Sequence, residues 1–374
     1  MINETLSTYM PQENAILVGV AANGGTQARL NLYASLDELA SLAHGAGAKV
    51  VARITQHLST RSRTYLGQGK LRELKELQKA SDSTVVIFND ELTPTQQRNL
   101  ERELTIKVLD RSALILDIFA KQARSREGVL QVDLAQHQYL LPRLAGQWSH
   151  LERLGGGIGT RGPGETQLET DRRLIRKRIK LLEGQLEAVR RHRNLYRKRR
   201  HASKIPVVSL VGYTNAGKST LFQSLARAEV VTGDRPFSTL DPITKRIVLP
   251  TGLPILLTDT VGFIHNLPTQ LIAAFRATLE ELADAHLLLH VVDISKPQAE
   301  ERTKVVTETL SELGLSGAPA ILVQNKFDLI DESDHGTIKT LSAPGQIGTA
   351  KVSALKGTGR QQLLNQIASH ILGS

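Results

Sequence analysis

The sequence predicts an α/β protein in three parts: a small parallel α/β domain, a helical hairpin, and a doubly wound α/β domain. Short apolar runs alternate with helix-like stretches over residues 1–110 and again over residues 205–374, which is the pattern of parallel sheets with crossover helices. Residues 111–204 show weak strand signals and helical periodicity instead. We therefore place the domain boundaries at residues 110 and 204.

Residues 1–110 contain four predicted strands, which are AILVGV (15–20), KVVARI (49–54), STVVIF (83–88) and IKVLD (106–110). The stretch 35–47 is a predicted helix with Ser35 as its N-cap, Glu38 at position N3 and a glycine at its end. Two further helices are predicted at 70–80 and 93–105, and the second has a proline near its start.

Residues 111–204 are predicted to form an antiparallel helical hairpin. Its first helix is residues 124–144, which are helical in pattern up to Pro142. Its second helix carries apolar residues at spacings of 7, 4, 3, 4 and 3, namely Leu168, Ile175, Ile179, Leu182, Leu186 and Val189. This spacing is typical of a coiled-coil-like seam. The glycine-rich stretch GGGIGTRGPGE (155–165) lies between the helices and is the expected tip of the hairpin.

Basic residues are concentrated in the first half of the chain. The formal net charge is +10, yet residues 205–374 hold slightly more acidic than basic residues. Residues 172–200 contain 13 Lys and Arg against Glu183 and Glu187 alone. A solvated helix normally mixes both signs, so this excess favours contact with a nucleic-acid backbone. The alternative is a generic basic surface.

The composition is that of an ordinary soluble globular protein, with 40% hydrophobic and 22% charged residues. No apolar run approaches the ~18 residues of a membrane span, and the first residues show no secretory signal. The absence of cysteine excludes disulfides and thiolate metal sites. We expect a cytoplasmic protein, and a monomer.

Six predicted strands, IPVVSLVG, IVLP, PILLTDT, HLLLHVVDI, PAILVQNK and GTAKVSAL, form the expected sheet of residues 205–374. After the first comes GYTNAGKS (212–219), which matches the phosphate-binding pattern G-x-x-x-x-G-K-[ST] between a strand and a helix. Backbone N–H groups surround the phosphates in such a loop, Lys218 reaches the β and γ phosphates, and the Ser219 hydroxyl binds Mg²⁺. A chance glycine turn is the alternative, and the strand–loop–helix context argues against it.

The stretch NKFD (325–328) predicts that the nucleotide is GTP rather than ATP. It follows the strand PAILVQ, where it would meet the base. The Asp328 carboxylate is able to accept from both the ring N–H and the exocyclic amine of guanine, a donor pair that adenine lacks. Asn325 is expected to brace the loop, and SAL (353–355) to place a backbone N–H on the guanine oxygen.

The stretch DTVGF (259–263) raises a question about hydrolysis. Asp259 and Gly262 have the pattern of a segment that senses the terminal phosphate, and in many such proteins the next residue is a glutamine that orients water. Here that residue is Phe263, which has no polar group. We expect slow intrinsic hydrolysis, with the missing chemistry supplied by a cation or by a partner.

GYTNAGKS, FSTLD (237–241), DTVG, NKFD and SAL together resemble the five G motifs of translation-factor-related P-loop GTPases. The resemblance implies that Lys218, Thr239 and Gly262 are catalytic and that Ser219, Thr239 and, through water, Asp259 hold Mg²⁺. Thr244 competes with Thr239 for this role. The implied GTP-binding residues are Gly212, Tyr213, Thr214, Asn215, Ala216, Gly217, Lys218, Ser219, Phe237, Ser238, Thr239, Leu240, Asp241, Asp259, Thr260, Val261, Gly262, Asn325, Lys326, Phe327, Asp328, Ser353, Ala354 and Leu355.

Three further stretches, TYLGQGKLRELK (64–75), FNDELTPTQQRNLE (88–101) and GGGIGTRGPGETQLETDRR (155–173), resemble signature segments of the HflX family of ribosome-associated GTPases. This resemblance implies a GTPase that binds the large ribosomal subunit and its RNA and separates ribosomal subunits under stress. The alternatives are a ribosome-assembly GTPase and a non-catalytic anti-association factor locked by GTP. Many members continue with a small extra domain, whereas this chain ends about one helix after SAL.

Two further binding roles follow from the resemblance to these GTPases. The glycine-rich loop is expected to contact RNA through Gly155, Gly156, Gly157, Gly159, Arg161, Gly162 and Gly164, with a second nucleotide site or a packed hinge as alternatives. Asn215 occupies the position where related GTPases place a potassium ligand, and an asparagine that only caps the loop is the alternative. GQGK (67–70) is interpreted as a turn.

Overall fold

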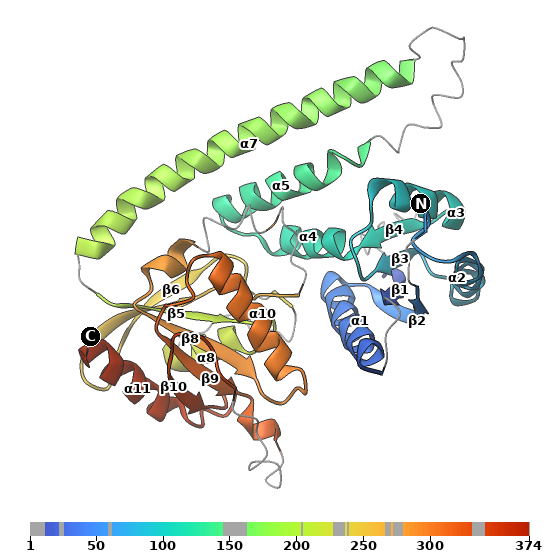
Figure 1. Cartoon of the computed structure of the whole chain (residues 1–374). Helices are drawn as coiled ribbons and strands as arrows, with labels where there is room; N and C mark the ends of the chain where they lie inside the picture. Colours follow the sequence, from blue (N-terminus) through green and yellow to red (C-terminus); the bar gives the residue numbers. More distant parts are fainter. Residues whose placement is uncertain are drawn as a thin grey trace, which may run out of the picture. The chain divides into compact units, whose positions relative to one another are not determined.

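The computed structural model describes residues 12–21, 26–58, 62–144, 163–202, 205–226, 236–237, 239–265, 271, 280–330 and 341–373. The chain divides into two compact units (Figure 1), Met1–Ile118 with Tyr139–Leu174 and Phe119–Gln138 with Ile175–Ser374. Helix α4 (Arg111–Gln122) and helix α5 (Arg126–Leu140) each have residues in both units. No helix of the described ranges is long and apolar enough to cross a membrane.

The first unit contains a four-stranded parallel sheet with the order β2-β1-β3-β4. Its strands are β1 (Asn14–Ala21), β2 (Lys49–His57), β3 (Val85–Phe88) and β4 (Lys107–Asp110), and its crossover helices are α1 (Thr26–Ala46), α2 (Gln68–Ser81) and α3 (Pro94–Leu104). Alternate residues of β1 and β3, among them Ile16, Val18 and Phe88, lie in one buried apolar cluster with Leu74 and Leu100. This confirms the predicted small parallel α/β domain.

One predicted helix start in this unit is wrong. Helix α1 begins at Thr26, so Ser35 lies in its middle and is not an N-cap. The Ser35 hydroxyl donates to Asn89 Oδ1 at 3.1 Å, and Glu38 forms an ion pair with Arg111. Ser35 and Glu38 therefore bond to residues that directly follow β3 and β4, because this face of α1 packs against the sheet. Thr93, by contrast, caps α3 with a capping box.

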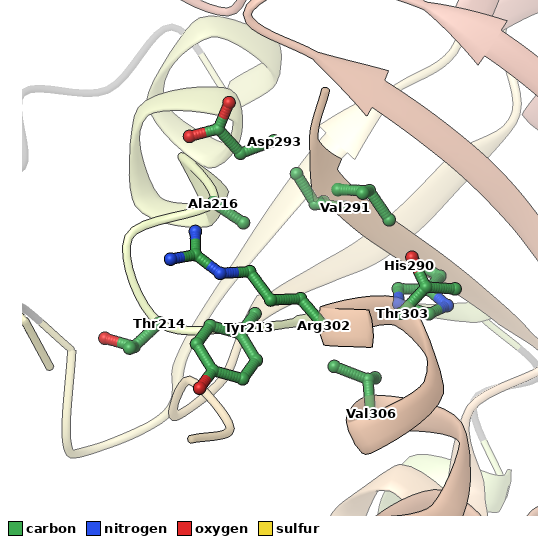
Figure 2. A pocket seen from close by; sticks show the side chains of 10 residues that line it. Tyr213, Thr214, Ala216, His290, Val291, Asp293, Arg302, Thr303 and Val306 are labelled. Carbon is green, nitrogen blue, oxygen red and sulfur yellow. The ribbon is translucent and has the colours of Figure 1, made fainter. Parts of the chain in front are cut away.

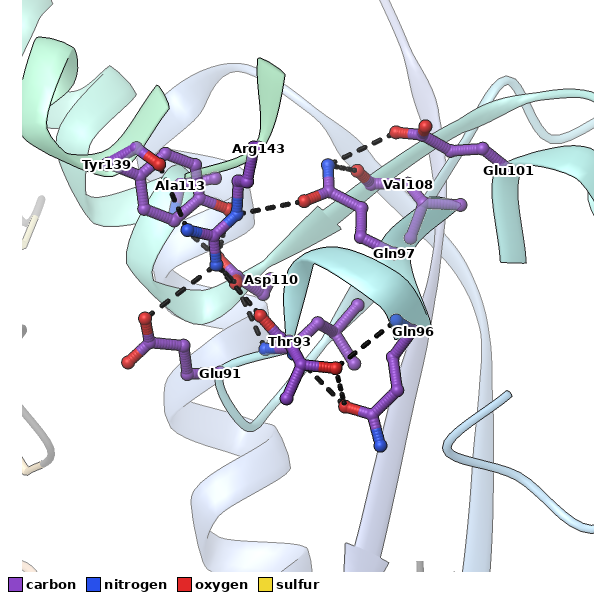
Figure 3. Close-up of polar contacts among 11 residues, drawn as sticks. Glu91, Thr93, Gln96, Gln97, Glu101, Val108, Asp110, Ala113, Tyr139 and Arg143 are labelled. Carbon is purple, nitrogen blue, oxygen red and sulfur yellow. Dashed lines mark hydrogen bonds and ion pairs between the residues drawn. The ribbon is translucent and has the colours of Figure 1, made fainter. Parts of the chain in front are cut away.

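A buried polar cluster fixes the last turn of α5 within the first unit (Figure 3). The Arg143 guanidinium bonds to Asp110 Oδ2 at 3.2 Å and Gln97 Oε1 at 3.1 Å, and lies 3.6 Å from the centre of the Tyr139 ring. Asp110 is fully buried and also accepts from the Tyr139 hydroxyl at 3.0 Å. Burial and the Asp110 charge raise the pKa of Tyr139, so this phenol stays a donor.

The helical part of the chain consists of α4, α5 and the long helix α7 (Pro163–Ala202). The sequence analysis assigned no helix to residues 111–122, which form α4. The apolar seam of α7 is its least exposed stripe: Leu182 is fully buried, and Ile175, Ile179, Leu186 and Val189 are half-buried. Arg178 Nη2 joins α7 to Asp133 of α5 at 2.6 Å.

The second unit contains a six-stranded sheet with the order β10-β9-β8-β5-β7-β6, parallel except for β6. Its strands are β5 (Val207–Gly212), β6 (Ile243–Val248), β7 (Pro254–Asp259), β8 (Leu287–Asp293), β9 (Ala320–Asn325) and β10 (Gln346–Lys351). Its helices are α8 (Lys218–Ala226), α10 (Ala299–Glu312) and α11 (Arg360–Gly373), with 3-10 turns η2 (Glu280–Asp284) and η3 (Phe327–Leu329). The doubly wound fold is confirmed, whereas the boundaries at residues 110 and 204 stay a prediction.

Candidate nucleotide site

The phosphate loop connects the carboxyl end of β5 to the first residue of α8. Two of its glycines are required by close contacts. A Cβ on Gly212 would lie 2.3 Å from the Val291 carbonyl oxygen, and a Cβ on Gly217 would lie 2.2 Å from Asn325 Nδ2. Both glycines also have positive φ, of 153° and 90°. Glycine is therefore required at these two positions of the loop because β8 and β9 leave no space for a side chain.

Lys218 is folded back into this loop. Its Nζ donates to the carbonyl oxygens of Gly212 at 3.1 Å and Tyr213 at 2.9 Å. Burial lowers the pKa of Lys218 to about 8, although the nearby charge of Asp259 acts in the opposite direction. Burial likewise raises the pKa of Asp259 above its ordinary value. A buried ammonium of this kind is stabilised when an anion such as a phosphate binds beside it.

The three expected Mg²⁺ ligands lie together although they come from distant parts of the chain. Ser219 Oγ is 2.7 Å from Thr239 Oγ1, which donates to Asp259 Oδ2 at 2.8 Å. Asp259 Oδ1 is buried and has no hydrogen-bond partner among the described residues. Two hydroxyls and a carboxylate are hard oxygen donors, so this set fits Mg²⁺. Thr244 instead bonds to Thr258 across the β6–β7 ladder, at 3.0 Å.

Phe263 has a structural position in the site. Its ring is 2% exposed, its N–H donates to Gly212 O at 3.1 Å, and its carbonyl accepts from Thr214 N at 2.6 Å. The residue before it, Gly262, passes so close to the loop that a Cβ would lie 2.8 Å from Thr214 Cα and 2.9 Å from Lys218 Nζ. The backbone of this segment is therefore paired with the phosphate loop, and the Phe263 side chain faces the core.

Asn325 joins the phosphate loop to the expected base-binding loops. Its Nδ2 donates to the Ala216 carbonyl at 2.9 Å, and its Oδ1 accepts from Ala354 N at 3.0 Å. The residue is 1% exposed. One amide side chain therefore bridges two loops that lie more than a hundred residues apart in sequence.

The remaining residues of the guanine motifs surround this bridge. Lys326 has a left-handed backbone, and its Nζ lies 2.8 Å from Asp293 Oδ2 at the end of β8. The Asp328 carboxylate lies 3.7 Å from Lys356 Nζ. Leu355 of the SAL loop is 83% exposed.

The FSTLD segment is held on two sides. Phe237 N donates to Thr214 Oγ1 at 3.1 Å, and both Phe237 and Leu240 are buried. The Asp241 carboxylate, expected near GTP, instead accepts from the backbone N–H groups of Arg124 and Ser125. Ser238 lies outside the described residues.

Among the remaining predicted residues, the Thr260 hydroxyl donates to Leu210 O at 2.6 Å and so ties β7 to β5. Val261 is buried, whereas Asn215 is exposed on the loop. The glycine-loop residues Gly155, Gly156, Gly157, Gly159, Arg161 and Gly162 lie outside the described residues, and Gly164 falls in the first turn of α7.

A small pocket adjoins the phosphate loop on the side of β8 and α10 (Figure 2). The Arg302 guanidinium lies 5.1 Å from the centre of the Tyr213 ring, and His290 and Thr303 also line the pocket. Sequence reasoning missed Arg302, as it missed Asp293 and Ser125, because none of them belongs to a short motif.

Three family models match successive parts of the chain. Residues 33–120 match the family "GTP-binding GTPase N-terminal", residues 122–200 match "GTP-binding GTPase Middle Region", and residues 207–326 match "50S ribosome-binding GTPase".

The chain is 51% identical over 340 residues to the protein called GTPase HflX of Caldanaerobacter subterraneus subsp. tengcongensis, covering 90% of this chain and 78% of the relative. It is 44% identical to GTPase HflX of Escherichia coli, covering 90% and 79%. A solved GTP-binding protein from Sulfolobus solfataricus in complex with GDP is 26% identical, with a TM-score of 0.50 over 97% of this chain and 99% of that one. The chain therefore belongs to the HflX family of GTPases, and it is a GTP hydrolase.

Proposed function

We propose that this GTPase binds Mg²⁺ and GTP at the site described above and uses them on the large ribosomal subunit, where it separates ribosomal subunits under stress. The observation that most directly supports binding to ribosomal RNA is the surface of α7. Basic side chains that are exposed to solvent follow one another along this helix, among them Arg173, Arg176, Lys177, Lys180 and Arg191. Such a surface suits the phosphate backbone of RNA.

Ser219 and Thr239 would hold the Mg²⁺ directly, and Asp259 would hold it through water. The ion supplies positive charge to the β and γ phosphates, which Lys218 also contacts. The N–H of Gly262 is the expected donor to the γ phosphate, since the close approach of this glycine to Lys218 leaves no room for a side chain.

Guanine specificity is assigned to Asp328, with a backbone N–H of the SAL stretch (353–355) as a second contact. Asp328→Asn should shift nucleotide preference from GTP toward xanthosine triphosphate, whose ring carries an oxygen where guanine has the amine. Titration with fluorescent GTP, XTP and ATP measures this shift. Wild-type protein that binds ATP as tightly as GTP would exclude the assignment.

Hydrolysis is expected to be slow in the isolated protein because the buried ring of Phe263 cannot orient water. We propose that K⁺ beside Asn215 and the ribosome together supply the missing activation. In GTPases where an arginine finger has this role, it raises the rate of hydrolysis by about 10³–10⁵. Turnover should be higher in KCl than in NaCl, and Asn215→Ala should remove this difference. Rapid GTP turnover in NaCl that does not change when large subunits are added would contradict both the K⁺ activation and the ribosome activation.

The RNA role of α7 is tested by reversing charges. The test variant carries glutamate at Arg173, Arg176 and Lys177. The matched control carries glutamate at three exposed basic residues of β6 and α10 in the nucleotide-binding fold, namely Lys245, Arg246 and Lys304. The test variant should bind large subunits more weakly, with a salt slope smaller by about 3, since each phosphate contact contributes about 0.9. Equal loss in both variants would indicate a nonspecific charge effect.

Subunit separation itself is tested by sucrose-gradient sedimentation of intact ribosomes with the protein and a non-hydrolysable GTP analogue. Appearance of free subunits supports the proposal. Binding only to immature large subunits would favour an assembly role, and splitting without any ribosome-stimulated turnover would favour an anti-association factor. A variant with residues 155–164 replaced by a short Ser/Asn turn should keep GTP affinity and lose splitting, if this loop contacts RNA.

A further inference from the structure

The segment that carries Thr239 is anchored at both ends by the junction between α4 and α5. On one side of Thr239, the Phe237 ring packs edge-to-face on Phe119 of α4, with ring centres 4.6 Å apart. Gln122 Nε2 also donates to the Pro236 carbonyl at 3.3 Å. Both aromatic rings are buried, at 0% and 2% exposure, so this is a packed contact and not a surface encounter.

On the other side of Thr239, the Asp241 carboxylate binds the turn that leads into helix α5. Oδ2 accepts from the backbone N–H groups of Arg124 at 3.0 Å and Ser125 at 2.7 Å, and Oδ1 accepts from the Ser125 hydroxyl. Ser125 Oγ in turn accepts from Gly128 N at 2.9 Å, which makes Ser125 the N-cap of α5. The negative charge lies where the unpaired N–H groups and the helix dipole favour it.

Gly128 shows how close this approach is. A Cβ at Gly128 would lie 2.4 Å from Asp241 Oδ1. A glycine in the first turn of a helix weakens that helix relative to alanine, so its presence here is explained by the space that the Asp241 carboxylate needs.

We propose that Ser125 and Asp241 are positioning residues for GTP hydrolysis. Their hydrogen bonds hold the chain on the far side of Thr239 while Phe119 holds the near side, and the Thr239 hydroxyl is thereby kept within 2.7 Å of Ser219 and 2.8 Å of Asp259. The inference rests on the proposed role of Thr239 as a Mg²⁺ ligand. Its consequence is that ordering of this segment by Mg²⁺ and GTP also holds the turn before α5, the helix that α7 contacts through Arg178 and Asp133.

The test measures GTP turnover against Mg²⁺ concentration in Ser125→Ala and Asp241→Asn. Both should raise the Mg²⁺ concentration for half-maximal turnover by about fivefold or more, the factor that corresponds to a lost helix cap of about 1 kcal/mol. GDP affinity in the absence of Mg²⁺ should stay at the wild-type value, which shows that the variants are folded. Ser125→Thr, which keeps the hydroxyl, should restore the wild-type Mg²⁺ dependence.

Thr93→Ala is the matched control, because it removes the same kind of cap from α3 and should leave the Mg²⁺ dependence unchanged. Hydrogen exchange gives a second readout: Mg²⁺ and a non-hydrolysable GTP analogue should protect the amides of Arg124 and Ser125, which donate to Asp241, in wild type and not in Asp241→Asn.

Thr239→Val distinguishes failure of the positioning role from failure of the proposed metal site. If Thr239→Val raises the Mg²⁺ requirement while Ser125→Ala and Asp241→Asn behave as wild type in both readouts, the positioning role is overturned and the metal site stands. If Thr239→Val itself leaves the Mg²⁺ requirement unchanged, the proposed metal site is wrong.

Discussion

His290 should make the nucleotide-binding unit sensitive to acid. This side chain lies on β8 at 2% exposure, and its Nε2 has no hydrogen-bond partner among the described residues. Burial and the nearby charge of Lys218 lower the pKa of His290 from 6.5 to about 4. Since the unfolded chain takes up a proton more readily than the folded one, the stability of the fold falls as the pH falls through this window.

The size of the effect follows from the two pKa values. Well above pH 6.5 the imidazole is neutral in both states and contributes nothing to the pH dependence. By about pH 4 the free energy of unfolding is about 3 kcal/mol lower than at neutral pH, because each unit between the two pKa values corresponds to about 1.4 kcal/mol. His290→Gln keeps a polar side chain that does not titrate, so the difference between variant and wild type isolates this histidine.

The measurement is native-state hydrogen exchange of peptides from β8 and β9 between about pH 4 and pH 7, corrected for the intrinsic exchange rate. The opening free energy of wild type should fall by about 3 kcal/mol more than that of His290→Gln over this range. Peptides from β1 and β3 in the first unit are the internal control and should show no difference between the two proteins. Parallel pH profiles for β8 and β9 in both proteins would refute the reasoning.

Three further substitutions have distinct expected outcomes. Asn325→Ala leaves one buried carbonyl and one buried N–H unpaired, so calorimetry should show weaker GTP binding and urea unfolding a loss of about 2–5 kcal/mol; unchanged binding would contradict the bridge. Gly262→Ala forces a Cβ to 2.8 Å from Thr214 Cα and should reduce turnover more than GDP affinity in steady-state assays. Arg143→Met removes the guanidinium from the buried Asp110 carboxylate and should destabilise the first unit by about 3–5 kcal/mol in thermal unfolding, while an unaltered melting curve would show that the pair is dispensable.

The sequence alone determined the features whose cause is local. The phosphate loop is recognisable because its whole pattern lies within residues 212–219, between a strand and a helix, although the atoms that exclude a Cβ at Gly212 and Gly217 belong to β8 and β9. The guanine motif is recognisable for a similar reason, since Asn325 and Asp328 must be an amide and a carboxylate. The strands could be predicted because alternating apolar runs are sufficient to specify a parallel sheet between helices.

Only the tertiary structure decided the roles that depend on what lies opposite a side chain. Ser35 has a good capping pattern in sequence, yet it bonds to Asn89 because α1 begins earlier and buries that face. Asp241 was expected beside the nucleotide, yet its carboxylate bonds to Ser125, 116 residues away. Such pairings are set by the free energy of burying polar groups with their partners, and that free energy depends on contacts between segments that the order of residues along the chain does not reveal.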